Sequence, residues 1–208
     1  MAEIAVAGLV RHSTVDWPGE LVATVFCQGC PWACRYCHNP ALLAAGPGSI
    51  AWAEVMAFLH RRRGLLDGVV ISGGEPTLQS DLAAALSEIR ALGFRTGLHT
   101  GGPYPARLAK AAPLLDWVGF DVKAPFGAYD RITGVPGSGA KARDSLILLR
   151  DSGVALDPRT TVHPALLSAA DLARIDAELD ALGLPPSRRQ PFRAEGCADQ
   201  ALGAWAGA

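Results

Sequence analysis

Three closely spaced cysteines, Cys30, Cys34 and Cys37, constrain this chain more than any other feature. Thiolates in the pattern C-x3-C-x2-C can converge from one loop on a single soft metal centre, and iron–sulfur clusters are held by cysteine thiolates. Three ligands, where four would close a four-iron cube, leave one iron open to a small molecule. An electron carrier needs no open iron, so the spacing predicts a catalytic iron–sulfur site.

Other uses of the cysteines fit the sequence less well. Structural zinc sites usually pair a C-x2-C unit with a second pair or with two histidines, whereas the later cysteine here is the isolated Cys197. Disulfides are disfavoured by the odd count of five cysteines in a chain without a secretion signal. Cys27 ends an apolar run and is interpreted as strand packing, with cluster contact as the alternative, and Cys197 is interpreted as a spare thiol. A zinc-binding or non-catalytic iron–sulfur module remains the alternative from another functional class.

Composition bounds the partners and the location. The 208 residues fit a single domain spanning residues 1–208, and half of them are apolar. The net charge of −1 shows no excess of positive charge of the kind that binds nucleic acid or an anionic membrane. No apolar run approaches the roughly 20 residues of a membrane span, and the N-terminus lacks the basic region of a signal peptide. We therefore expect a cytoplasmic protein, and an anaerobic setting because oxygen destroys exposed clusters.

Short apolar segments alternate along the chain with longer amphipathic ones. The short segments are rich in branched residues, as buried parallel strands are, and the alternation indicates repeated βα units. Six units are too few for a closed eight-stranded barrel, so the expected fold class is α/β, a partial (open) (β/α)6 barrel. The predicted strands cover 21–27, 68–72, 94–100, 117–122, 155–162 and 189–193, and the predicted helices cover 52–63, 81–92, 105–112, 140–152 and 170–182.

Polar or glycine-rich clusters follow five of these strands. In barrels of this kind the chemistry lies at the C-terminal ends of the strands, on the loops that lead into the helices. We therefore expect these clusters to meet on one face of the sheet. They are, in strand order, the cysteine loop, Gly73-Gly74-Glu75-Pro76, Thr100-Gly101-Gly102, Asp121-Val122-Lys123 and His163.

The cysteine pattern with Tyr36 before its last member, followed by Gly73-Gly74-Glu75-Pro76, resembles the radical S-adenosylmethionine (SAM) superfamily. The longer string Phe-x-x-Gly-Cys-x3-Cys-x2-Cys-His-Asn-Pro is similar to the activating enzymes of glycyl-radical enzymes. Further segments resemble the activating proteins of the anaerobic ribonucleoside-triphosphate reductase, and together they span residues 8–198. These segments are Ser13-Thr14-Val15-Asp16-Trp17-Pro18-Gly19, Asp121-Val122-Lys123-Ala124-Pro125, Arg159-Thr160-Thr161-Val162 and Gln190-Pro191-Phe192-Arg193.

This resemblance implies a radical SAM core in which Cys30, Cys34 and Cys37 hold a catalytic [4Fe-4S] cluster. The open iron would chelate the amino and carboxylate groups of SAM. The reduced cluster would cleave SAM to methionine and a 5′-deoxyadenosyl radical, which takes a hydrogen atom from a glycine of a partner. The implied partners are a glycyl-radical enzyme, the anaerobic ribonucleotide reductase, and an electron donor such as flavodoxin or ferredoxin. The protein's own share is placement and exclusion of side reactions.

Roles follow for the residues that bind the cofactor. Gly73 and Gly74 let a backbone approach a ligand closely, and Glu75 can accept from its ammonium, the alternative being an ordinary turn. Lys123 can meet the methionine carboxylate while Asp121 orders a lysine or a ribose hydroxyl, the alternative being a surface ion pair. Five further residues are expected at the cofactor. Tyr36 and His38 would lie beside the adenine, while Thr100, Arg159 and His163 would contact other parts of the cofactor. A purely structural role is the alternative for Tyr36, His38 and His163, and a salt bridge in the barrel wall is the alternative for Arg159.

One segment departs from the family pattern. Related activators often carry Asp-Thr-Asn-Gly after the third strand, where this chain has His99-Thr100-Gly101-Gly102. The loss of that carboxylate and amide puts in doubt any cation site built there. A small-molecule radical SAM enzyme, such as 7-carboxy-7-deazaguanine synthase, is the alternative within the superfamily. Such an enzyme would need a polar pocket for its substrate. An activase needs a cavity entrance wide enough to admit the glycine-containing loop of its partner.

Overall fold

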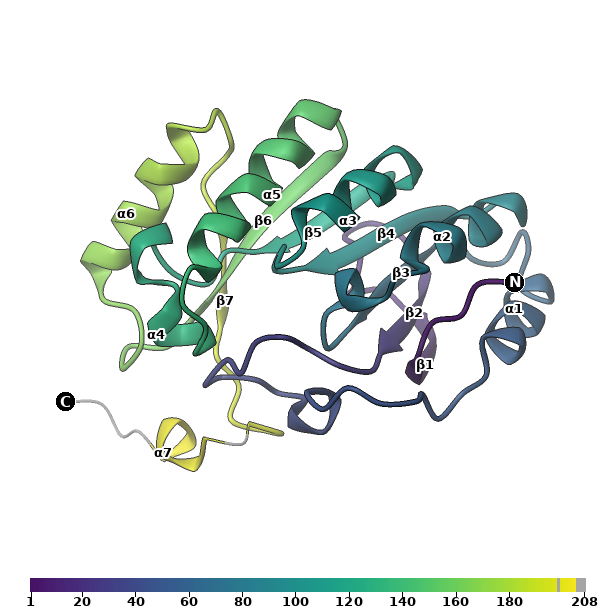
Figure 1. Cartoon of the computed structure of the whole chain (residues 1–208), viewed down its shortest axis with the longest axis horizontal. Helices are drawn as coiled ribbons and strands as arrows, with labels where there is room; N and C mark the ends of the chain where they lie inside the picture. The colour runs from purple at the N-terminus through teal and green to yellow at the C-terminus, as the bar shows by residue number, and fades with distance from the viewer. Residues whose placement is uncertain (198, 205–208) are drawn as a thin grey trace.

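A seven-stranded sheet with strand order β1-β2-β3-β4-β5-β6-β7 organises the computed structural model, which describes residues 1–197 and 199–204 (Figure 1). Strands β2 to β7 run parallel, and β1 pairs with β2 in the antiparallel direction. In the described part of the chain β1 and β7 are the two edges, so the barrel is open, as predicted. The strands are β1 (Val6–Ser13), β2 (Val22–Cys27), β3 (Gly68–Gly73), β4 (Arg95–Thr100), β5 (Trp117–Asp121), β6 (Ala155–Val162) and β7 (Arg188–Pro191).

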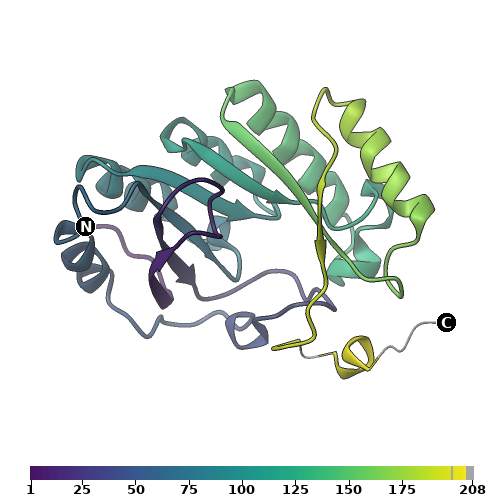
Figure 2. The ribbon, with the colours of Figure 1, turned by 180° about the vertical axis from the view of Figure 1, so that it is seen from behind.

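Helices connect the parallel strands. Figure 1 shows α2, α3, α5 and α6 along one face of the sheet, and Figure 2 shows the strands from the other side. No described helix is long and apolar enough to cross a membrane. The helices are α1 (Trp52–His60), α2 (Leu82–Ala91), α3 (Pro105–Ala111), α4 (Asp130–Thr133), α5 (Ser138–Ser152), α6 (Ala169–Asp180) and α7 (Gln200–Gly203), with 3-10 turns η1 (Pro40–Leu42), η2 (Pro76–Leu78), η3 (Ala112–Leu114) and η4 (Phe126–Ala128).

The parallel strands form because their side chains are buried on both faces. Val69, Ile71 and Leu98 are fully buried in the main core, and Val70 belongs to a second core cluster. That second cluster also contains Trp17 and Trp117, whose rings stack with centroids 5.4 Å apart. All six predicted strands are confirmed to within about two residues at their ends.

Strand β1 is the element that the sequence analysis missed. Of its eight residues only Val6 is buried, and Arg11 and His12 are exposed. An edge strand that faces solvent lacks the continuous apolar run by which the buried strands were recognised. The short helices α4 and α7, of four residues each, were also missed because little more than one helical turn is too short to show an amphipathic period.

Candidate active site

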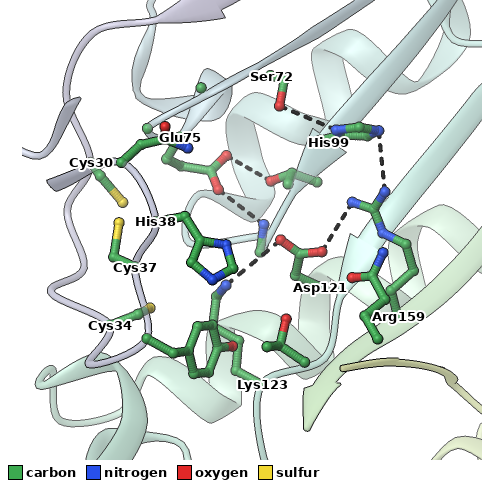
Figure 3. A pocket seen from close by; sticks show the side chains of 18 of the residues that line it. Cys30, Cys34, Cys37, His38, Ser72, Glu75, His99, Asp121, Lys123 and Arg159 are labelled. Carbon is green, nitrogen blue, oxygen red and sulfur yellow. Dashed lines mark hydrogen bonds and ion pairs between the residues drawn. The ribbon is translucent and has the colours of Figure 1, made fainter. Parts of the chain in front are cut away.

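A cavity of about 630 Å³ lies at the C-terminal ends of the parallel strands (Figure 3). Its walls come from the loop after β2, the ends of β3, β4 and β5, and side chains of β6 and β7. Five polar clusters were predicted to meet here, and four of them do. The predicted site residues that line the cavity are Cys30, Cys34, Tyr36, Cys37, His38, Gly73, Gly74, Glu75, Thr100, Asp121, Lys123 and Arg159.

The cysteine loop is held by its own backbone. The N–H of Cys30 donates to the Leu43 carbonyl at 3.0 Å, and the N–H of Cys37 donates to the Cys34 carbonyl at 2.9 Å. Figure 3 shows the three thiol groups on the same side of the cavity. The sequence therefore folds this loop so that all three sulfur atoms face one space.

The thiols of Cys30 and Cys34 are partly buried. Burial raises the pKa of Cys30 to about 12 and also raises the pKa of Cys34, so both are protonated at neutral pH unless a metal binds them. No three His, Cys, Asp or Glu side chains among the described residues gather closely enough to hold a single metal ion. A four-iron cluster takes one thiolate per iron, so its ligands surround a larger body than one ion does.

Gly73 and Gly74 allow the end of β3 to lie directly against the cysteine loop. Gly73 has a φ of +115°, and a Cβ there would come within 2.2 Å of the Cys27 nitrogen. A Cβ on Gly74 would come within 2.3 Å of the Gly29 oxygen. The close approach predicted for these glycines is thus made to the chain's own backbone, which fixes the cavity floor beside the cysteines.

Glu75 is buried and bonded on both carboxylate oxygens. Its Oε1 accepts from the backbone N–H of Thr77 at 3.0 Å, and from the hydroxyls of Thr77 and Thr100 at 2.6 Å each. Its Oε2 accepts from the N–H of Gly101 at 3.0 Å. Burial raises the pKa of Glu75, and these hydrogen bonds oppose the shift. The side chain therefore ties the end of β3 to the end of β4 and keeps one oxygen with spare acceptor capacity.

Lys123 and Asp121 face the cavity from the end of β5. The Lys123 Nζ lies 3.7 Å from Asp121 Oδ2, and it lies over the rings of Trp32 and Tyr36 at 5.8 and 5.6 Å from their centroids. Burial alone lowers the pKa of Lys123, but the groups around it, Tyr36 first and Asp121 among them, raise it well above its usual value. The lysine is therefore a buried cation in an aromatic wall.

Arg159 is bonded to Asp121 and lies beside His99 near the end of β4. Its Nη2 donates to Asp121 Oδ1 at 3.0 Å and to the Gly119 carbonyl at 3.2 Å, and its Nη1 lies 3.2 Å from His99 Nε2. Burial alone raises the pKa of Asp121, but the charges of Arg159 and Lys123 outweigh it and hold the pKa below its usual range. Asp121 is thus an ionised carboxylate between two cations.

His99 occupies the position where the family pattern has an aspartate. Its Nε2 lies 2.7 Å from the Asp16 carbonyl, which only accepts, so Nε2 carries the proton and Nδ1 accepts from the Ser72 hydroxyl at 3.1 Å. Burial, and then the Arg159 charge, lower the pKa of His99 to about 4. The ring is therefore neutral at pH 7, and it brings no carboxylate to this part of the cavity.

The structure does not bring His163 to the cavity. Its Nδ1 accepts from the Ala165 N–H, and its Nε2 lies 3.1 Å from the Leu202 carbonyl. Cys27 is fully buried in the core and does not line the cavity, in agreement with its interpretation as strand packing. Cys197 also lies outside the cavity, with its Sγ 3.5 Å from the Arg35 carbonyl.

The sequence analysis did not select several residues of the cavity wall. Trp32 stands inside the cysteine loop and is 3 % exposed, so an aromatic residue between ligand cysteines was an available signal. Asp16 belongs to a segment that carried the family resemblance. Ser72, Arg188 and Arg189 also line the cavity, and the sequence alone offered no signal for them. His99 and Arg193 lie in segments that were noted in the sequence, but no role was assigned to their side chains.

The residues present fit an iron–sulfur cluster with an amino-acid-like ligand. Three thiols are present that can bind iron. The buried ammonium of Lys123 can bind a carboxylate, and a carboxylate oxygen of Glu75 can accept a further hydrogen bond. Two buried nitrogens, His38 Nε2 and Arg159 Nε, have no hydrogen-bond partner among the described residues. Buried polar atoms normally have partners, so this cavity retains unused donors and acceptors for a polar ligand.

The fold and the cavity define an α/β protein of the partial-barrel type with its chemistry on the strand ends. The Radical SAM superfamily model matches residues 24–167, more than half of the chain, and the chain belongs to that superfamily. Members use a [4Fe-4S] cluster and SAM, which are therefore the cofactors of this chain.

Individual relatives are more distant. A protein of Methanocaldococcus jannaschii, named as a candidate glycyl-radical enzyme activating enzyme, is 29% identical over 180 residues, which cover 82% of this chain and 73% of the relative. PqqA peptide cyclase of Xanthomonas euvesicatoria pv. vesicatoria is 34% identical over 148 residues, covering 64% of this chain but only 37% of the relative. Streptococcus suis SuiB bound to S-adenosylmethionine superposes with a TM-score of 0.64 at 13% identity, over 80% of this chain and 39% of that one, and shares the fold.

Proposed function

We propose that this chain is a single radical SAM domain that activates a glycyl-radical enzyme, the anaerobic ribonucleoside-triphosphate reductase, by taking a hydrogen atom from a glycine. The observation that carries the proposal is the Methanocaldococcus relative, because the match covers most of both chains. The string from Phe26 to Pro40, which is similar to that of glycyl-radical activating enzymes, supports it. An electron donor such as flavodoxin or ferredoxin completes the system.

In this proposal Cys30, Cys34 and Cys37, which line the cavity, would hold the cluster. When bound, the reduced cluster supplies the electron that cleaves SAM to methionine and a 5′-deoxyadenosyl radical. The chain's own groups bind and orient the substrate: Lys123 offers its ammonium to the methionine carboxylate, and Glu75 Oε2 can accept from the methionine ammonium.

The cavity walls limit where water and other hydrogen donors can enter. Trp32 and Tyr36 are 3 and 8 % exposed and close the side behind Lys123. His38 contributes a nitrogen that has no partner in the described chain, and Tyr36 and His38 flank the last cysteine where an adenine would lie. Arg159 fixes the Asp121 carboxylate, and Thr100 is fixed by Glu75. These groups position a ligand, and the cofactors perform the difficult step.

The test begins with anaerobic reconstitution, reduction and addition of SAM, followed by detection of 5′-deoxyadenosine. We expect about four irons per chain in the wild type. The variants Cys30→Ala, Cys34→Ala and Cys37→Ala should lose cluster and product to the background level. Cys27→Ala is the matched control, since this cysteine is buried in the core and should leave iron content and product unchanged.

The second half of the test adds the anaerobic ribonucleotide reductase of the same organism. A glycyl-radical signal in its electron paramagnetic resonance spectrum, dependent on this chain and on SAM, supports the activase assignment. Product without any glycyl radical would instead indicate a radical SAM enzyme with another substrate, such as a small molecule. One zinc per chain and no iron would contradict the whole proposal.

A further inference from the structure

The chain after β7 lies against the cysteine loop in both views of the ribbon (Figures 1 and 2). We call residues 192–197 and 199–202 the C-terminal clamp. The superfamily match ends at residue 167, so this segment lies outside the region by which the family is recognised. Its contacts with the loop therefore have to be understood from the structure itself.

The first contact is an ion pair with a residue between two of the cysteines. Arg35 donates from Nε and Nη2 to Asp199 Oδ2, at 3.0 and 2.8 Å. The other oxygen of Asp199 accepts from the Ala201 N–H at 3.1 Å, so the carboxylate is oriented by the turn that starts α7. Two donors from one guanidinium set the direction of the pair as well as its distance.

The second contact is made to the backbone of the cysteine loop. Cys197 Sγ lies 3.5 Å from the Arg35 carbonyl. Gly196 has a φ of +80°, and a Cβ there would come within 2.7 Å of the His38 carbonyl oxygen. The clamp thus lies directly beside the residue that follows Cys37, at a separation that only glycine permits.

The third contact anchors the clamp to the sheet. The ring of Phe192 lies between two histidines, with centroids 5.6 Å from His38 and 4.9 Å from His163. Farther along, Leu202 is buried, and its carbonyl lies 3.1 Å from His163 Nε2 at the end of β6. The clamp is therefore fixed at both ends while its middle holds the cysteine loop.

The opposite side of the loop is tied to α4. The N–H groups of Ala33 and Arg35 donate to the carbonyls of Thr133 and Ile132, at 2.9 and 3.2 Å. These bonds hold the loop before Cys37, and the clamp holds it at Arg35 and His38. The loop that contains Cys34 and Cys37 is therefore contacted both by α4 and by the C-terminal clamp.

We propose that the C-terminal clamp positions the cysteine loop and slows loss of the cluster, with Arg35 and Asp199 as the residues through which it acts. This inference rests on the proposed assignment of the cluster to Cys30, Cys34 and Cys37. Each of the three irons that a thiolate holds would leave only when that thiolate separates from it, which requires local opening of the loop, whereas the open iron has no thiolate to release. A clamp that must release before the loop opens therefore lowers the rate of iron loss.

The experiment uses the reconstituted full chain and measures the anaerobic rate of iron transfer to an excess of a chelator, bathophenanthroline disulfonate. The rate compared is that of the irons released after the first one, because the open iron has no thiolate to hold it. We expect Arg35→Gln and Asp199→Asn each to raise this rate about threefold, as suits an exposed ion pair. The double variant should be no faster than either single one, because both changes remove the same interaction. Asp199→Glu keeps the carboxylate and should restore most of the wild-type rate.

Arg90→Gln is the matched control. The Arg90 to Asp116 pair has the same 2.8 Å separation and similar exposure, 41%/31% against 50%/24%, but Asp116 immediately precedes β5, at the opposite end of the strands. Its loss should leave iron release at the wild-type rate. The role of the clamp would be overturned if Arg35→Gln and Asp199→Asn released iron at the wild-type rate. It would also be overturned if the two increases in rate multiplied in the double variant, and in both cases the cluster assignment would stand. A wild-type chain that binds no iron would overturn the cluster assignment, and the inference with it.

Discussion

Two carboxylates, Glu75 and Asp121, face the same cavity from the ends of β3 and β5, yet their surroundings are opposite. Glu75 is 3 % exposed and accepts from hydroxyl and backbone groups that carry no charge. The side chain of Asp121 is 40% exposed and lies between two cations, Arg159 and Lys123. Burial raises the pKa of the first, and the charged partners lower the pKa of the second.

The difference separates a fixed part of the cavity from an adaptable one. The hydrogen bonds of Glu75 leave no freedom to reorient without breaking several of them. Asp121 instead makes one close bond to Arg159, and its second oxygen is 3.7 Å from Lys123, beyond hydrogen-bond length. Lys123 can therefore turn toward a ligand at little cost, while Glu75 keeps the β3 and β4 ends in place.

Replacement of Glu75 should produce the largest loss of stability. Glu75→Ala leaves the hydroxyls of Thr77 and Thr100 and the N–H of Gly101 buried without their acceptor. We expect a loss of about 3 kcal/mol, which corresponds to a fall in melting temperature of roughly 6–12 °C for a chain of this size. Calorimetry of the chain without cluster measures it.

An exposed glutamate provides the control for that experiment. Glu54 lies in the first turn of α1 on the surface, and Glu54→Ala should change stability by less than about 0.5 kcal/mol. If Glu75→Ala melts as the wild type does, the network does not fix the strand ends, and the contrast with Asp121 disappears.

Replacement of Lys123 should show the reverse pattern. Lys123→Met keeps the volume of a buried side chain, and Asp121 remains paired with Arg159, so the melting temperature should move by less than about 3 °C. A charge-assisted hydrogen bond to the SAM carboxylate would be lost, which raises the dissociation constant about 10- to 100-fold. Anaerobic titration calorimetry on the reconstituted chain gives this value. Unchanged SAM affinity together with a large loss of stability would mean that Lys123, like Glu75, is structural.

The fold could be predicted from the sequence to the extent that its elements are buried. The strand at 68–72 carries three consecutive branched residues, 69–71, because both of its faces are covered, and this pattern is visible without a structure. Strand β1 left no such pattern, since only one of its eight residues is buried. The predicted convergence at the strand ends was correct for four of the five clusters, because parallel strands place their C-terminal ends on one edge of the sheet.

The site could be predicted where chemistry and spacing coincide. The three cysteines and Glu75 were predicted at the site, and they line the cavity. They could be selected because few other kinds of site need cysteines at that spacing followed by Gly-Gly-Glu-Pro. The direction of a side chain was not available from the sequence, so His163 was expected at the cofactor although its ring is directed to Leu202. Arg188 and Arg189 were missed because an arginine on a short edge strand has no pattern that distinguishes it.

The smallest predicted effect is the pH dependence of the two carboxylates, and it has opposite sign for each. The folded-state pKa of Glu75 is raised above 4.5 by burial, so its contribution to stability is fully present below pH 4.5 and is lost as the pH rises through the folded-state value. The folded-state pKa of Asp121 is held below 3.8 by Arg159 and Lys123, so its contribution is present above pH 3.8 and is lost as the pH falls through the folded-state value.

Urea unfolding of the chain without cluster, from about pH 3 to about pH 7, measures both contributions. The stability difference between wild type and Glu75→Gln should narrow as the pH rises, because the charged carboxylate is the less stable buried form. The difference between wild type and Asp121→Asn should narrow as the pH falls, because protonation removes the attraction to Arg159. Two slopes of the same sign would mean that the cations do not control Asp121, and that the cavity has one electrostatic environment instead of two.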